Sequence, residues 1–320
     1  MTDRATASII IPTYYRNDLL QSAIESALTQ EYEPIEVIVV DDSGERYAKP
    51  VVDDYEGITY IALDENLGEN PARDVGLDSA SGRYVQFLDD DDLLREDKIR
   101  LQEQHLDDQT GVVYSGMQYH ESGQVILPES DVKGDVLERA LEFRMWPPCF
   151  TSAMLIDRDV LEQIRPLKFH GAGDTTFMIG LAQRTQFEFV DEPLVEKRHG
   201  DSLGFSLENV RNKKQLLNVY EDLYDQFPES RRSAKAHSFY QEGRIRLSES
   251  VWSPRAIAAF ARAVYYSPSD RTEYARDFVG SFGGQPGLRA AGLAGWFGKS
   301  VREDGVSATL RKTTAYLRSR

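Results

Sequence analysis

The chain has little cysteine, little lysine and no long apolar run. Its 320 residues include a single cysteine, Cys149, which excludes an intrachain disulfide. No segment approaches the roughly 18 consecutive apolar residues that a membrane-spanning helix needs. The first residues also show no signal-peptide pattern. We therefore expect the main body of the chain to lie in the cytoplasm.

Two common nucleotide-binding motifs are also missing. No Gly-x-Gly-x-x-Gly follows the first predicted strand, which disfavours a dinucleotide-binding fold. The sequence contains no Walker A motif, which disfavours a P-loop enzyme.

The charge is strongly negative. There are 53 acidic and 37 basic residues, for a net charge of −16, and this argues against nucleic-acid binding. Only 10 of the basic residues are lysine. A surplus of acid with little lysine suggests a protein adapted to a high-salt cytoplasm, such as that of a halophilic archaeon, where salt screens self-repulsion. An acidic protein of a mesophile is the alternative.

The C-terminal segment 286–320 differs from the rest, with seven basic and two acidic residues. Aromatic and aliphatic residues, among them Trp296 and Phe297, alternate with the basic ones. This pattern predicts a helix on an anionic membrane surface, and hence peripheral association with the inner face of the cell membrane. Docking of the tail on the chain's own acidic body is the alternative.

The order of apolar segments predicts an α/β fold followed by helices. Short apolar runs predict strands, and four-residue spacings predict helices between them, so we expect a mostly parallel sheet covered by helices. The predicted strands are Ser8–Ile11, Ile35–Val40, Thr59–Leu63, Tyr84–Leu88, 112–114, 124–127, 153–156 and 187–190. The predicted helices are Asn17–Leu28, Asn70–Ala80, about Leu93–Leu106, and segments near 135–143, 157–164 and 174–184. The predicted domains are 1–205 (α/β), 206–285 (helical, with a linker at 281–287) and 286–320 (basic tail).

Four consecutive carboxylates, Asp89 to Asp92, follow the strand Tyr84–Leu88. A buried strand that ends in acids places them at the carboxyl edge of the sheet, where open α/β folds bind ligands. Clustered carboxylates repel one another unless a cation lies among them. A hard divalent ion that also binds phosphate oxygens fits such a cluster. A solvated acidic loop is the alternative.

The first two strands also end in polar and aromatic residues. Pro12, Thr13, Tyr14 and Arg16 follow the first strand, and Asp41-Asp42 follow the second. In a parallel sheet both tips meet at one edge. A hydroxyl, an aromatic face and a carboxylate together suit a planar base, which donates N–H groups and stacks on a ring.

Taken together, residues 6–204 resemble the inverting family 2 glycosyltransferases, which have the GT-A fold. The matching stretches are Ser8–Tyr14, Val39–Ser43, Asn66–Gly68, Ala72-Arg73 with Gly76, Ala80–Gly82 and Phe87–Asp92.

The resemblance implies that Pro12, Thr13, Tyr14 and Asp41 bind the base, usually uracil, and that Asp42 and Arg73 lie near the nucleotide-sugar. Arg16 and Asp90 are further donor-binding candidates. Asp89 and Asp91 would be the outer residues of a D-x-D motif that holds Mn²⁺ or Mg²⁺ against the diphosphate. Two positions depart from the usual pattern, since Asp74 replaces a frequent Asn and Asp90 a frequent Ser.

The same resemblance implies a general base and a third metal ligand. The general base would be Asp174, which follows Gly171-Ala172-Gly173 at the start of a predicted helix. A purely structural role as helix N-cap is the alternative. His199 would touch the diphosphate or the metal, and a solvent-exposed histidine without a role is the alternative.

The predicted activity is inverting transfer of a hexosyl or uronosyl group from a nucleotide-diphosphate sugar, most often a UDP-sugar. The acceptor would be a lipid-linked glycan on dolichyl or polyprenyl phosphate, as in N-glycan or surface-glycan assembly. A catalytically inactive binding scaffold is one alternative. A nucleotidyltransferase is another, but residues 12–20 lack the glycines of a phosphate loop and contain Arg16 as their single basic residue.

Overall fold

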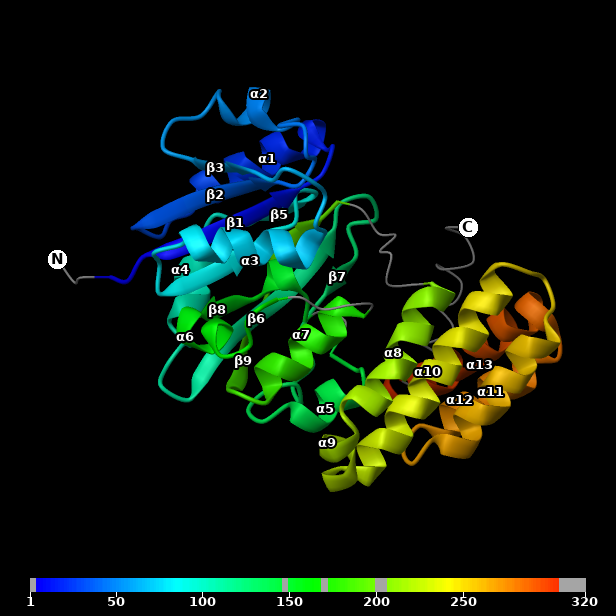
Figure 1. Cartoon of the computed structure of the whole chain (residues 1–320). Coiled ribbons are helices and arrows are strands. Elements are labelled where there is room, and N and C mark those ends of the chain that lie inside the picture. Colours follow the sequence, from blue (N-terminus) through cyan, green and yellow to red (C-terminus); the bar gives the residue numbers. More distant parts are fainter. Residues whose placement is uncertain (1–3, 146–148, 168–171, 199–205, 305–320) are drawn as a thin grey trace. The chain divides into compact units, whose positions relative to one another are not determined.

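The computed structural model describes residues 4–145, 149–167, 172–198 and 206–304 (Figure 1). The chain divides into two compact units, residues 1–202 and 203–320.

The first unit is built on a nine-stranded sheet within the described residues. Its strands are β1 (Ala7–Thr13), β2 (Ile35–Asp41), β3 (Thr59–Ala62), β4 (Tyr84–Phe87), β5 (Asp92–Leu94), β6 (Thr110–Tyr119), β7 (Val125–Ile126), β8 (Leu155–Asp157) and β9 (Gln186–Lys197). They lie in the order β3-β2-β1-β4-β8-β6-β9-β5, with β7 paired to β6. The strands β3, β2, β1 and β4 run parallel to one another, whereas β8 is antiparallel to both β4 and β6. The parallel half therefore brings the ends of β1, β2 and β4 to one edge.

The helices of this unit are α1 (Asn17–Leu28), α2 (Lys49–Val52), α3 (Glu69–Ser79), α4 (Lys98–Glu103), α5 (Leu137–Leu141), α6 (Arg158–Glu162) and α7 (Gly173–Ala182), with a 3-10 turn η1 (Thr151–Ala153). Strand β1 is buried along its whole length because helices cover both of its faces. Ile9 and Ile11 pack in one cluster with Leu20 of α1. Ile10, which points the other way, lies against Gly76 of α3, where a Cβ atom would approach its side chain to 2.4 Å. Gly76 thus allows α3 to pack closely on the sheet.

The predicted helix of about Leu93–Leu106 is confirmed only in its middle, and its start is wrong. Residues 92–94 form β5, which pairs antiparallel with β9, and helix α4 occupies only 98–103. Strand β9 runs to Lys197, well beyond the predicted 187–190, and provides the hydrogen-bonding partner that β5 needs. Pairing with a strand about a hundred residues away therefore overrode the local helical spacing.

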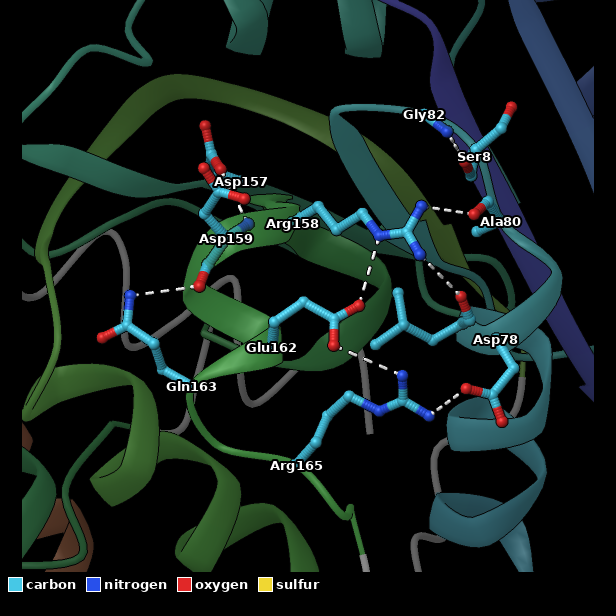
Figure 2. A network of polar contacts seen from close by, with 12 residues as sticks. Ser8, Asp78, Ala80, Gly82, Asp157, Arg158, Asp159, Glu162, Gln163 and Arg165 are labelled. Carbon is cyan, nitrogen blue, oxygen red and sulfur yellow. Dashed lines mark hydrogen bonds and ion pairs between the residues drawn. The ribbon is translucent and has the colours of Figure 1, made fainter.

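Two arginines anchor the C-terminal end of α3 (Figure 2). The Arg158 guanidinium donates hydrogen bonds to the carbonyl oxygens of Ala80 and Leu77, the latter at 3.4 Å. Arg165 pairs with Asp78 at 2.5 Å. It also pairs with Asp74 at 2.8 Å. Cations are favourable there because the last carbonyls of a helix are unpaired and carry partial negative charge. The contact with Arg165 also gives Asp74 a role on this helix, which carries Arg73.

The second unit is helical. Its elements are α8 (Leu207–Val219), α9 (Glu221–Gln226), α10 (Pro228–Ser248), α11 (Pro254–Tyr266), α12 (Arg271–Ser281) and α13 (Gly284–Asp304). Helix α10 packs against both α8 and α11 (Figure 1), and Gly243 allows the ring of Phe260 to approach the α10 backbone. The predicted linker at 281–287 is wrong, because α12 extends to Ser281 and α13 begins at Gly284. Among the described residues, no helix is both long and apolar enough to span a membrane.

Candidate active site at the carboxyl edge of the sheet

The structure brings the ends of β1 and β2 together at one edge. Thr13 lies opposite Asp41 in the parallel register, and the backbone N–H of Asp42 donates to the carbonyl oxygen of Thr13 at 2.9 Å. Pro12 and Thr13 are buried, whereas the side chain of Tyr14 is 49% exposed. The edge therefore has a buried polar base and an exposed aromatic rim.

The two buried carboxylates at the end of β2 are occupied by the protein itself. Asp41 accepts hydrogen bonds from the backbone N–H groups of Ser43 (3.0 Å) and Ala48 (2.7 Å), and from the hydroxyl of Tyr60 (2.8 Å). Asp42 accepts two further backbone hydrogen bonds, from Leu67 at 2.7 Å and Gly68 at 2.8 Å. These bonds fix the loops on either side of the edge.

A cluster of exposed tyrosines lies on these loops. The ring centroid of Tyr15 is 4.7 Å from that of Tyr14 and 4.8 Å from that of Tyr47. Tyr15 has a φ of 54°, which is strained for a bulky side chain and is typical of functional sites. Exposed rings on this edge suit stacking against a planar base. Sequence analysis named Tyr14 alone; Tyr47 reaches the site through the loop that Asp41 holds.

The acidic run divides into two parts. The Asp90 carboxylate turns toward β1, where it accepts from the Thr13 hydroxyl at 2.8 Å and from Arg16 at 3.1 Å. Burial raises the pKa of Asp90 to about 6, although the bonds from Thr13 and Arg16 act to lower it. The other three residues, Asp89, Asp91 and Asp92, each offer a carboxylate oxygen, and these oxygens lie within 4.8 Å of one another.

Each carboxylate of this three-residue acidic cluster faces a cationic side chain. Arg73 pairs with Asp89 at 2.7 Å, Arg16 with Asp91 at 2.9 Å, and Lys197 with Asp92 at 3.3 Å. Burial acts to raise the pKa of Asp89, but Arg73 and Lys197 outweigh it and the pKa is lowered. Asp89 is therefore held in the charged form that a metal ligand requires.

Arg73 is the centre of a buried network. Its side chain donates to Asn70 (3.0 Å), Asp89 (2.7 Å) and the Thr151 hydroxyl (3.0 Å), and it also contacts Glu69. Within the described residues its Nε atom has no hydrogen-bond partner. The guanidinium thus joins helix α3, the acidic cluster and the turn η1.

Asp174 lies exposed in the first turn of α7. The N-cap of this helix is Ala172 and it makes no side-chain cap bond, so the alternative role of Asp174 as the N-cap is wrong. Arg73 acts to lower the pKa of Glu69. Burial and the negative charges of Asp89 and Asp174 act in the opposite direction and raise this pKa to about 7. Asp174 therefore lies within electrostatic reach of the Arg73 network.

A buried polar network behind the acidic cluster, here termed the brace, was not predicted from the sequence. Lys98 donates to the side-chain oxygens of Gln86 and Gln102, the latter at 2.5 Å. The amide groups of these glutamines donate to the carbonyl oxygens of Ser152 (3.0 Å) and Ala153 (2.8 Å). The brace therefore fixes η1, whose Ser152 hydroxyl accepts from the Asp89 backbone N–H at 3.1 Å. The one sequence signal was a glutamine, Gln86, inside an apolar strand, because the complete burial of Lys98 is visible only in the structure.

The donor set of the acidic cluster fits a hard divalent cation. Three carboxylate oxygens this close together match the all-oxygen sites that Mg²⁺ and Mn²⁺ prefer. Asp92 joins the predicted ligands Asp89 and Asp91. The third predicted ligand, His199, lies outside the described residues.

Residues 8–165 match the family model described as glycosyl transferase family 2. This part of the chain is a family 2 glycosyltransferase domain. A 93-residue segment is 43% identical to the GalNAc(5)-diNAcBac-PP-undecaprenol beta-1,3-glucosyltransferase of Campylobacter jejuni, covering 27% of this chain and 30% of the relative. A 99-residue segment is 36% identical to the putative teichuronic acid biosynthesis glycosyltransferase TuaG of Bacillus subtilis, covering 30% and 39%. The chain thus spans well under half of the length of these curated relatives.

Solved structures resemble the chain over almost its whole length. S. aureus TarS 1–349 in complex with UDP-GlcNAc superimposes with a TM-score of 0.59 at 18% identity, covering 94% of this chain and 95% of that one. Its complex with UDP gives a TM-score of 0.57, with coverages of 98% and 92%. This likeness confirms the predicted GT-A-like α/β fold with C-terminal helices.

Proposed function

We propose that this chain is an inverting glycosyltransferase that moves a sugar from a UDP-sugar to a hydroxyl group of a lipid-linked glycan. One observation carries the proposal: the acidic cluster, the buried Arg73 and the exposed Asp174 lie within interaction range of one another. Membership of residues 8–165 in the glycosyltransferase family supports it.

The donor would bind at the β1–β2 edge. The rings of Tyr14, Tyr15 and Tyr47 stack on the base, and Pro12 and Thr13 form the floor beneath it. Arg16, whose side chain is 52% exposed, can turn from the acids to the diphosphate. Because the oxygens of Asp41 and Asp42 already accept backbone N–H groups, these residues act chiefly by holding the loops in place.

Asp89, Asp91 and Asp92 would hold Mn²⁺ or Mg²⁺, with Asp90 beside them turned toward Thr13. When bound, the ion supplies positive charge that stabilises the departing diphosphate. Arg73 keeps Asp89 ionised and in place through its ion pair. The proposed role of His199 as a further ligand is carried by the sequence alone.

Asp174 would act as the general base. Its carboxylate accepts the proton of the acceptor hydroxyl while the acceptor oxygen forms a bond to the anomeric carbon. The bond from that carbon to the diphosphate oxygen breaks on the opposite face, so the configuration inverts.

The acceptor and the cellular location rest on two observations. The name of the Campylobacter relative includes an undecaprenol-linked glycan, and residues 286–320 combine basic residues with aromatic and aliphatic ones. We therefore propose an acceptor on a polyprenyl or dolichyl phosphate at the inner face of the cell membrane. The acid-rich, lysine-poor composition supports a host with a high-salt cytoplasm.

Calorimetry with UDP and GDP, in the presence and absence of Mn²⁺, tests the donor proposal on the full chain. We expect Mn²⁺-dependent binding of UDP, and unchanged binding in the control Asp54→Asn, an exposed acid outside the site. Absence of binding to either nucleotide under both conditions would favour the scaffold alternative.

Asp174→Asn separates chemistry from binding. We expect unchanged Mn²⁺-dependent UDP binding and a loss of sugar transfer of about 10²- to 10⁴-fold, the range that general base catalysis contributes. The measurement is the rate of UDP release while the enzyme hydrolyses UDP-sugars or transfers their sugar to an acceptor. Retained turnover would place the base elsewhere.

Membrane association is tested by removing residues 305–320. A deletion from 286 would remove most of α13, which packs on α12, and would disturb the fold. Sedimentation with vesicles that contain anionic lipid should fall in the shorter deletion, and equal sedimentation would argue against a tail anchor.

A further inference from the structure

The helical unit contains a basic island in an acidic chain. Residues 228–266, which form α10 and α11, include seven basic and three acidic residues, whereas the whole chain carries −16. A protein with this overall charge repels polyanions, so a local surplus of cations marks a place where an anion can approach.

Cations and aromatic rings from α8, α10 and α11 contact one another. The set, here termed the α10–α11 patch, consists of Lys214, Lys235, Phe239, Arg262, Tyr265 and Tyr266. The rings of Phe239 and Tyr266 stack with centroids 5.8 Å apart and an interplanar angle of 12°. The Lys214 ammonium lies 4.0 Å and the Arg262 guanidinium 5.4 Å from the Phe239 centroid. Lys235 lies 5.6 Å from the Tyr266 ring.

The cations of the patch are not equally available. Lys214 already pairs with Glu242 at 2.6 Å. Lys235 and Arg262 form no ion pair with any carboxylate in the described part of the chain, and Arg262 is exposed. Two positive charges are therefore held beside aromatic rings with no acid to neutralise them.

Helix packing explains only part of this arrangement. The contacts of Phe239 with Lys214 and Arg262 join α8, α10 and α11, and cation–π contacts of this kind stabilise surfaces modestly. Packing does not require Tyr265, which is 72% exposed and rests edge-on against Tyr266 at 5.0 Å. An exposed tyrosine three residues along the same helix from an unpaired arginine is the composition of a binding surface.

We propose that the α10–α11 patch binds a phosphate-bearing glycan. Arg262 and Lys235 would bind the phosphate oxygens through charge-assisted hydrogen bonds. The exposed ring of Tyr265, whose faces carry negative partial charge, would contact the C–H edges of a sugar ring. The inference rests on the proposed function in one respect, because it takes this glycan to be the acceptor.

The chemistry favours a glycan over other anions. Two unpaired cations are few for nucleic acid, whose binding commonly involves about 6 to 10 phosphate contacts. A membrane-surface helix presents a wide apolar face, whereas two of these three rings are tyrosines with polar hydroxyl groups, set edge-on to each other.

Phosphomannan and dephosphorylated mannan provide matched probes for thermophoresis with the full chain. We expect binding to phosphomannan, weakened by salt, and much weaker binding to mannan. Arg262→Ala should weaken phosphomannan binding about tenfold, the effect of losing one charge-assisted hydrogen bond. Tyr265→Ala should also weaken phosphomannan binding. Because Tyr265 is exposed, its loss removes little packing and should not unfold the chain. Arg244→Ala is the control, since Arg244 is also exposed but lies on α10 outside the patch.

Several results would overturn the proposal. They are equal affinity for both mannans, an equal loss in the Arg244→Ala control, unchanged binding in Tyr265→Ala, and binding only to anionic vesicles. Mn²⁺-dependent UDP binding by the same variants separates this inference from the proposed function. Phosphomannan binding without UDP binding would retain the patch and reject the donor proposal, whereas UDP binding without phosphomannan binding would do the reverse.

Discussion

Two acidic pairs at the same edge of the sheet have the same appearance in the sequence but different environments in the structure. Asp41 and Asp42 follow β2, and their carboxylates accept hydrogen bonds from four backbone N–H groups and one tyrosine hydroxyl. Asp89 and Asp91 follow β4, and they face another carboxylate and two guanidinium groups. The hydrogen-bonding capacity of the first pair is used by the fold itself, whereas the carboxylates of the second pair still repel each other.

The difference separates a structural acid from one available for chemistry. A carboxylate bonded to backbone N–H groups is already neutralised by local dipoles, and its removal leaves those groups unpaired. Carboxylates that face one another are most stable with a cation among them. Substitutions in the two pairs should therefore affect different measurements.

The largest effect is expected for Asp91→Asn. Loss of one carboxylate from the acidic cluster should lower Mn²⁺-dependent turnover by about a thousandfold, since the ion contributes several kcal/mol to charge stabilisation. The midpoint of urea unfolding without divalent ions should stay the same or rise, because repulsion is removed. A variant with lower stability and full turnover would show that Asp91, like Asp41, is a structural acid.

Asp41→Ala should show the opposite pattern. Its removal leaves the backbone N–H groups of Ser43 and Ala48 without their acceptor and should lower the free energy of unfolding by about 3 kcal/mol. Asp41→Asn keeps one carbonyl oxygen and should recover part of the loss. Urea unfolding without nucleotide is the measurement. A free energy of unfolding equal to that of the unaltered chain would show that these hydrogen bonds do not stabilise the fold.

Asp90→Asn sharpens the comparison through pH. Because burial raises the pKa of Asp90 from 3.8 to about 6, its ionised form destabilises the folded state above that pH. The penalty is absent below about pH 4, grows between the two pKa values, and is complete above about pH 6. Asp90→Asn should therefore be more stable than the unaltered chain by about 2 kcal/mol at pH 8, and by nothing at pH 3.5. A pH-independent difference in urea unfolding would contradict this assignment.

The smallest effect is expected for Lys98→Met. Burial lowers the pKa of Lys98 well below its usual range, so loss of its hydrogen bonds is partly offset by relief from burying an amine. We expect a loss of about 1 kcal/mol in the free energy of unfolding. Turnover should fall more than stability suggests, because Ser152 and Thr151 position Asp89 and Arg73. Lys98→Arg, which is too large for the fully buried site, should be worse than Met.

Much of the fold was predictable from short-range patterns. The predicted helix Asn17–Leu28 matches α1 at both boundaries, because its apolar spacing is a local signal. The strand β5 was not predictable, since its three residues are extended only because Lys197 and Glu196 lie opposite them. The buried brace of Gln86, Lys98 and Gln102 was hidden for the same reason.

The sequence by itself determined that an acidic run follows a buried strand, and that aromatic and acidic tips gather at one edge of a parallel sheet. Apolar runs and the alternation of strands with helices are local patterns, so they can be recognised in the sequence without the tertiary structure. The tertiary structure alone decided which acids are available, because hydrogen-bond partners come from distant segments. Asp90 turns to Thr13 of β1, Asp92 meets Lys197 of β9, and Asp41 is enclosed by its own loop. Which carboxylates can bind a metal thus depends on long-range packing.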